Sequence, residues 1–116
     1  MYEKKLPIDI DCSILITMEV IGGKWKCCII KHLAMQPLRP SELYRRFPGA
    51  NPRVITQQLK DLEFYGIITK KVYAEVPLRT EYFITDKGRT LLPLLDKIAE
   101  WGDLFRPDMK RILNID

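Results

Sequence analysis

The sequence predicts a mainly α-helical fold class with one small β-hairpin. Apolar residues recur at spacings of three and four along most of the chain, which is the period of an amphipathic helix. Two neighbouring segments, 67–74 and 80–85, are rich in β-branched and aromatic residues and predict two strands. The length of 116 residues, of which 47% are hydrophobic and 29% charged, suits one folded domain spanning 1–116.

Two helices are expected in the first third of the chain. The first begins at residue 11 or 12 and is ended by Gly22-Gly23. Its apolar face is formed by Ile14, Leu15, Met18 and Ile21. The second helix is predicted over 24–35, with Lys26 and Lys31 outside its buried side. The residues expected on that buried side are Trp25, Cys28, Ile29 and Leu33.

Two further helices, separated by a short turn, are expected next. Ser41 is expected to cap a short helix that runs through Phe47. Asn51-Pro52 predicts the start of the following helix, because Asn is a good N-cap and Pro has the φ angle of the first helical position. This helix is expected to reach about Tyr65, where Gly66 stops it.

The two predicted strands are joined by a five-residue loop, 75–79, and form the hairpin. After them, Thr85 or Asp86 is expected to cap a long helix that Pro93 lies within and bends. The apolar positions of this helix are Leu91, Leu94, Leu95, Ile98, Trp101, Leu104 and Phe105. Compact helices followed by a hairpin form the layout of a winged helix-turn-helix, here with an added terminal dimerisation helix.

The outer face of the predicted helix 51–65 carries residue types that read DNA. Ile55, Leu59 and Leu62 share one side of this helix and are expected to be buried. The opposite side carries Arg53, Thr56, Gln57 and Lys60. Arg pairs with guanine, Gln pairs with adenine, Thr contacts thymine or phosphate, and Lys neutralises phosphate. An amphipathic helix with a solvated polar face is the alternative interpretation.

A second group of polar and basic residues lies around this helix and favours a polyanionic partner. Lys70, Lys71 and Arg79 lie in or beside the hairpin, and Ser41 and Arg45 lie on the preceding short helix. We expect all five to contact DNA, although charge that protects a strand edge also accounts for the hairpin residues. The segment 24–89 contains 13 basic and 6 acidic residues, whereas the whole chain has a net charge of only +4.

Several separate motifs resemble those of the HxlR family of bacterial transcription regulators. They are Gly22-Gly23-Lys24-Trp25, Glu42-Leu43, 56–63 (TQQLKDLE), Tyr65-Gly66-Ile67, Val76-Pro77, 81–85 (EYFIT) with Gly88, and Trp101-Gly102. The resemblance implies a homodimer whose N-terminal and C-terminal helices associate and which binds operator DNA. It places Arg53, Thr56, Gln57 and Lys60 at the recognition positions. The chain departs from the family pattern at Pro40-Ser41 and Asn51-Pro52.

We therefore expect a sequence-specific, double-stranded DNA-binding transcription regulator that acts as a homodimer. The alternative is a winged-helix module that contacts another protein, which would favour aromatic and Met anchors on the outer face of helix 51–65. No enzymatic activity is expected, because the chain has one His and no recognisable catalytic or cofactor-binding motif. Cys28 and His32 share a helix face, but no further ligands accompany them, so no metal site is predicted.

Cys12 is a candidate redox-sensing thiol. It precedes the first predicted helix, whose N-terminus favours a thiolate, and Lys4 or Lys5 is expected nearby. Asp9 and Asp11 oppose that effect, and a packed cysteine is the alternative. A small molecule is the alternative to an oxidant as the effector. The absence of a signal-peptide pattern and of long apolar runs predicts a cytoplasmic protein without membrane contact.

Overall fold

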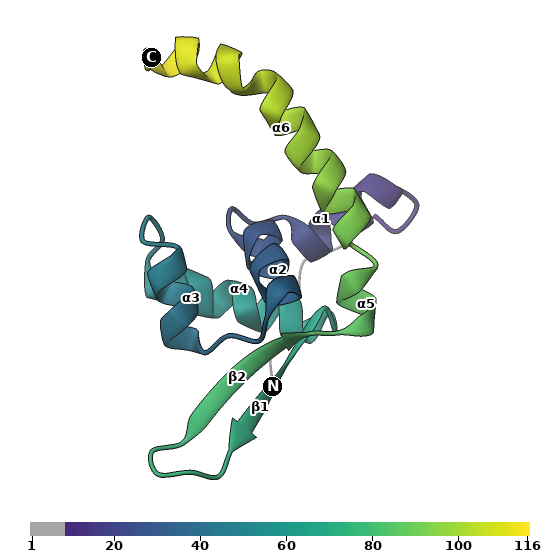
Figure 1. Ribbon diagram of the computed structural model, residues 1–116. Coiled ribbons are helices and arrows are strands. Elements are labelled where there is room, and N and C mark those ends of the chain that lie inside the picture. Colours follow the sequence, from purple (N-terminus) through teal and green to yellow (C-terminus); the bar gives the residue numbers. More distant parts are fainter. Residues whose placement is uncertain (1–8) are drawn as a thin grey trace.

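The computed structural model describes residues 9–116 and consists of a helical body, a projecting hairpin and a long C-terminal helix (Figure 1). In chain order the elements are α1 (Ser13–Ile21), α2 (Lys26–Met35), α3 (Pro40–Arg46), α4 (Pro52–Phe64), β1 (Ile68–Tyr73), β2 (Arg79–Ile84), α5 (Asp86–Arg89) and α6 (Leu92–Leu113). This is the predicted mainly helical class with one hairpin. Within 9–116, no helix is both long enough and apolar enough to cross a membrane.

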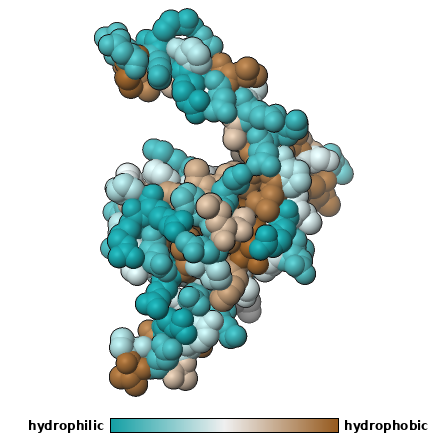
Figure 2. All heavy atoms as spheres, viewed as in Figure 1, coloured by the Kyte–Doolittle hydropathy of each residue, from teal (hydrophilic) through white to brown (hydrophobic). Residues whose placement is uncertain are grey.

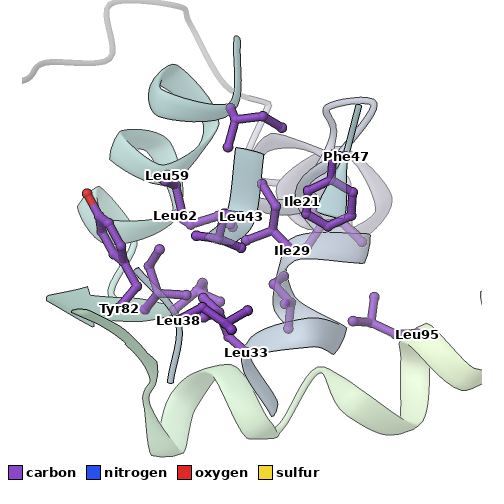
Figure 3. Close-up of a cluster of buried hydrophobic side chains, with 14 residues drawn as sticks. Ile21, Ile29, Leu33, Leu38, Leu43, Phe47, Leu59, Leu62, Tyr82 and Leu95 are labelled. Atoms are coloured by element: carbon purple, nitrogen blue, oxygen red, sulfur yellow. The ribbon is translucent and has the colours of Figure 1, made fainter. Parts of the chain in front are cut away.

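The core lies among the helices of the body, and the base of the hairpin and the start of α6 contribute to it (Figure 3). Its members come from every element except α5: Ile21, Ile29, Ile30, Leu33, Leu38, Leu43, Phe47, Ile55, Leu59, Leu62, Ile67, Ile68, Tyr82 and Leu95. The three apolar residues predicted for the buried side of α4 are all among them. Burial of this cluster supplies the main driving force for the fold.

The ends of α4 have the predicted chemistry. Asn51 is the N-cap, and its side-chain Oδ1 accepts a hydrogen bond of 2.8 Å from the backbone N–H of Arg53. Pro52 occupies the first helical position. After the helix, Gly66 has a φ of +75°, a left-handed conformation that favours glycine. Local sequence therefore determines where this helix begins and ends.

The predicted cap of α3 is wrong. The N-cap is Arg39 instead of Ser41, and the Glu42 side chain accepts a 2.8 Å hydrogen bond from the Arg39 backbone N–H. Pro40 causes the difference, because proline suits the first helical position and holds the preceding residue in an extended conformation. Ser41 is left on the exposed surface of the first turn.

The hairpin pairs β1 and β2 antiparallel, with Ile68 opposite Ile84 and Tyr73 opposite Arg79. Both strands lie within one or two residues of the predicted ranges. Leu38 adds a pairing that the sequence did not predict: it exchanges two backbone hydrogen bonds with Tyr82, of 3.2 and 2.8 Å. This bridge ties the connection between α2 and α3 to β2 and thereby holds the hairpin against the helices.

The expectation for α2 is wrong at two positions. Lys26, predicted outside the buried side, is only 2% exposed, whereas Cys28, predicted inside it, is exposed. The buried positions Lys26, Ile29, Ile30 and Leu33 follow the helical spacing of three and four. The buried face of α2 was therefore predicted wrongly because Ile30 was left out of the apolar pattern.

The predicted long helix is divided into α5 and α6, and Pro93 does not bend it. Thr85 caps α5 as predicted, accepting a 3.0 Å hydrogen bond from the Gly88 backbone N–H. Pro93 lies in the first turn of α6, where backbone N–H groups have no partner within the helix, so the missing N–H of proline costs no helical hydrogen bond. The internal proline is Pro107, and α6 curves along its C-terminal half in Figure 1.

Gly88 is expected to be intolerant of any side chain. A Cβ at this position would overlap the carbonyl oxygen of Ile67 and lie 2.8 Å from Cγ1 of Ile84. We expect Gly88→Ala to lower the free energy of unfolding by about 1–3 kcal/mol, the usual range for overpacking. Gly49→Ala is the matched control, because its nearest contact would be Trp25 at an ordinary 3.5 Å. Urea denaturation showing equal stability for both variants would contradict this expectation.

Candidate nucleic-acid interface

The outer face of α4 presents three exposed polar side chains in a row. Arg53, Gln57 and Lys60 are exposed, on the side of the helix opposite the buried residues Ile55 and Leu59. Their spacing of four and three places them along about two turns of one helix face. This face has the chemistry and shape to enter a major groove.

Thr56, the fourth residue predicted for this face, is only half exposed. Its hydroxyl donates to the carbonyl oxygen of Pro52 at 2.9 Å and lies 2.8 Å from the hydroxyl of Tyr44. Because the Thr56 proton is used by Pro52, Tyr44 is the donor in the second bond. The Thr56 hydroxyl is thus engaged within the protein, and its methyl group is the part suited to contact a base.

Contacts from α1 and α2 hold α4 from the side away from its outer face. The Gln58 side-chain oxygen accepts a 3.0 Å hydrogen bond from the Trp25 backbone N–H, just before α2. The Tyr65 hydroxyl donates to Glu19 of α1 at 2.8 Å. Asp61 forms an ion pair of 3.2 Å with the ammonium of Lys26. The exposed face is therefore presented by a helix that is fixed in place.

In the hairpin two lysines are exposed, whereas one arginine is held by contacts within the protein. Lys70 and Lys71 are exposed on β1. Arg79 donates two 3.2 Å hydrogen bonds to Glu75 and lies 3.9 Å from the ring centre of Tyr73. It also pairs with Glu81 at 3.7 Å. Phosphate binding by Arg79 would have to compete with two carboxylates, so the lysines are the better placed of the three.

Ser41 and Arg45 are both exposed on α3. Ser41 lines a groove of about 540 Å³ between the start of α3 and the loop of the hairpin. On the far side of this groove the loop is apolar: Val76 is fully exposed and Leu78 is 71% exposed. Figure 2 shows this apolar tip at the end of the otherwise polar hairpin.

A large apolar surface lies outside the core, on α1 and α6. Within α6 only Leu95 is buried. The exposed apolar residues of the two helices include Ile14, Leu15, Ile16, Met18, Leu94, Ile98, Trp101, Leu104, Met109 and Ile112. Trp101 and Phe105 stack on each other with ring centres 5.3 Å apart. Figure 1 shows the distal part of α6 projecting away from the helical body.

The cysteines and the single histidine occupy separate environments. All three cysteines carry free thiols; Cys12 is half-buried at the N-cap of α1, and burial raises the pKa of the Cys27 thiol. His32 packs against the ring of Phe47, and burial followed by the nearby Arg46 lowers its pKa. Within residues 9–116, no three His, Cys, Asp or Glu side chains are grouped so that they could hold a metal ion. Lys4 and Lys5, expected near Cys12, lie outside the described residues.

Sequence reasoning missed Lys26, Asp61 and Tyr44 as residues that support the α4 face. The signal for Lys26 was present, because it precedes Ile29 and Ile30 by the three and four residues of one helical face. Asp61 lies directly before the buried Leu62. The contact of Tyr44 with Thr56 had no signal in the sequence, since it depends on how α3 and α4 pack.

A short helix, a tight turn and a second helix with an exposed polar face, followed by a hairpin, define a winged helix-turn-helix protein. The pattern of the HxlR-like helix-turn-helix family matches residues 20–110. The chain therefore belongs to the HxlR family of DNA-binding transcriptional regulators, as its motifs predicted.

Relatives and solved structures agree with this assignment. An uncharacterized HTH-type transcriptional regulator of Methanothermobacter thermautotrophicus is 43% identical over 94 residues, which are 81% of this chain and 72% of the relative. YtcD of Bacillus subtilis, described in the same terms, is 43% identical over 102 residues, covering 88% and 78%. The structure of the redox regulator HypR in its reduced form has a TM-score of 0.79 and 37% identity, covering 86% of this chain and 99% of that one.

Proposed function

We propose that residues 1–116 act as one winged helix-turn-helix unit that binds a double-stranded operator sequence-specifically as a homodimer. The observation that carries this proposal is the exposed row of Arg53, Gln57 and Lys60 on a helix held firmly from behind. Arg53 and Gln57 read base edges, and Lys60 neutralises phosphate. Bound to operator DNA, the protein acts in the cytoplasm.

The hairpin and α3 supply contacts to the DNA backbone in this proposal. Lys70 and Lys71 approach the phosphates beside the groove that α4 enters, while Ser41 and Arg45 contact the backbone on the other side of α4. Arg79 joins them only when its contacts with Glu75 and Glu81 open. Such contacts set position and affinity, whereas the α4 residues set the preferred sequence.

The homodimer is formed by α6, joined by α1. Soluble monomers rarely expose apolar patches of more than a few hundred Å², and the two helices present at least ten exposed apolar residues. A second copy of the chain satisfies this surface and places two α4 helices for two half-sites of an operator. Cys12, at the start of α1, stays a predicted redox-sensing thiol; the similarity to a redox regulator supports it.

Single substitutions on the α4 face are expected to separate base reading from charge. Arg53→Ala or Gln57→Ala should remove about 1–3 kcal/mol of discrimination at one operator position. Lys60→Ala should weaken binding to every sequence and lower the slope of log affinity against log salt by about 1. The measurement is fluorescence anisotropy on operators selected from random duplexes, at several salt concentrations.

Lys110→Ala is the control for Lys60→Ala, because Lys110 is an exposed lysine at the far end of α6. It should leave the affinity for DNA and the salt slope unchanged. If the three α4 variants bind DNA as the unsubstituted protein does, the α4 face does not contact DNA. Failure of the chain itself to select any sequence would favour the protein-interaction module, in which α4 meets another protein.

A further inference from the structure

A continuous polar chain runs from the core to the outer face of α4. The side-chain Nε2 of Gln57 donates to Oδ1 of Asp61 at 3.3 Å, and Asp61 lies one helical turn after Gln57 on α4. The other carboxylate oxygen, Oδ2, lies 3.2 Å from the ammonium of Lys26. Lys26 is 2% and Asp61 8% exposed, whereas Gln57 is exposed. Each carboxylate oxygen thus has a different partner, one inside the fold and one on the surface.

The contact with Asp61 decides which way the Gln57 amide points. An ionised carboxylate only accepts hydrogen bonds, so the –NH₂ group of Gln57 must face it and the carbonyl oxygen must face away. One amide N–H is used by Asp61. When Asp61 takes the N–H that points away from the carbonyl oxygen, that oxygen and the other N–H lie side by side, which is the acceptor and donor pair that matches N6 and N7 of adenine.

We propose that Asp61 is a positioning residue for base recognition: it orients the Gln57 amide for adenine, and Lys26 holds Asp61 in place. This inference rests on the proposed function, because it needs Gln57 to read a base. An amide without this restraint can turn over and present its –NH₂ group to the acceptors of guanine. The ion pair therefore acts on specificity, which agrees with the small net stabilisation that buried ion pairs give relative to apolar residues.

The fold makes room for this arrangement at Gly23. A Cβ on Gly23 would lie only 3.1–3.2 Å from the carbon atoms of the Lys26 side chain. The Lys26 stem therefore passes directly over the glycine before its ammonium reaches Asp61. The ammonium belongs to α2 and the carboxylate to α4, so the orientation of Gln57 depends on how these two helices pack.

The test removes both charges at once, in Lys26→Met/Asp61→Leu, so that neither charge of the buried pair remains. The matched control is Lys31→Met/Asp96→Leu, which removes an exposed ion pair of 2.7 Å between α2 and α6. Operators carrying each of the four bases opposite Gln57 are compared by anisotropy. The buried-pair variant should lose about 5-fold or more of its preference for adenine over guanine. Its affinity for non-specific DNA and its salt slope should not change.

The same substitutions in a Gln57→Ala background provide the decisive comparison. If Asp61 acts through Gln57, the buried-pair change should have no further effect on base preference there. An unchanged adenine preference in the buried-pair variant, together with loss of preference in Gln57→Ala, overturns the inference and leaves the proposed function intact. A base other than adenine opposite Gln57 in the unsubstituted protein also overturns it. Absence of any sequence preference refutes the proposed function instead.

A second measurement needs neither DNA nor a variant. Side-chain amide ¹⁵N relaxation in the unsubstituted protein should show a restrained Gln57, compared with the exposed Gln36 at the end of α2. Equal mobility of the two amides would overturn the inference, because Asp61 would then not orient Gln57.

Discussion

Lys26→Met is expected to destabilise the protein by about 3–5 kcal/mol, a large share of the 5–15 kcal/mol that stabilises an ordinary domain. The substitution removes the ammonium that lies 3.2 Å from Asp61, so a carboxylate that is only 8% exposed loses this ion pair. A buried carboxylate that loses an ion-pair partner is destabilised because the protein interior solvates a charge less well than water does. The free energy of unfolding from urea denaturation, followed by circular dichroism, measures this loss.

The double variant Lys26→Met/Asp61→Leu should recover most of that stability, because replacing both partners by apolar residues of similar size is often neutral or stabilising. Lys31→Met is the control: its partner Asp96 is 61% exposed, and surface pairs contribute little. Equal stability of Lys26→Met and Lys31→Met would show that the charge of Asp61 is solvated in another way.

Trp101→Asp/Ile112→Asp is expected to convert the proposed dimer to a monomer and to weaken operator binding by about 100-fold or more. The two side chains are 63% and 69% exposed and lie on one stripe of α6, spaced eleven residues apart. Carboxylates placed in an apolar interface lose hydration without gaining a partner. A monomer binds one half-site, so it forfeits the gain from linking two binding units, which reaches 10²–10⁴-fold.

Lys110→Asp is the matched control, because it also changes the charge by two units but lies on the opposite side of α6 from Trp101 and Ile112. It should stay dimeric. Sedimentation at micromolar concentration gives the oligomeric state, and anisotropy gives the operator affinity of the same samples. A dimeric Trp101→Asp/Ile112→Asp variant would show that α6 does not form the interface.

Local sequence determined most of the secondary structure, because its signals act over a few residues. Asn51-Pro52 and Gly66 delimit α4 through a side-chain cap, a fixed φ angle and a left-handed turn, all of which are local. The abundance of β-branched and aromatic residues in two neighbouring segments likewise predicted the hairpin. The outer face of α4 followed from helical periodicity, which assigns Arg53 and Gln57 to the side opposite the core whatever the helix packs against.

Tertiary structure decided which of these side chains are free to act. Thr56 and Arg79 share the periodicity or composition of the predicted interface, yet one is engaged by Tyr44 and the other by Glu75. Lys26 and Asp61 are 35 positions apart, and no local pattern brings an ammonium on one helix to a carboxylate on another. The sequence by itself therefore determined the bounds of α4, the hairpin and the outer face of α4. Only packing determined the ion pair of Lys26 with Asp61 and the hydrogen bond of Tyr44 with Thr56, because these contacts join residues on different helices.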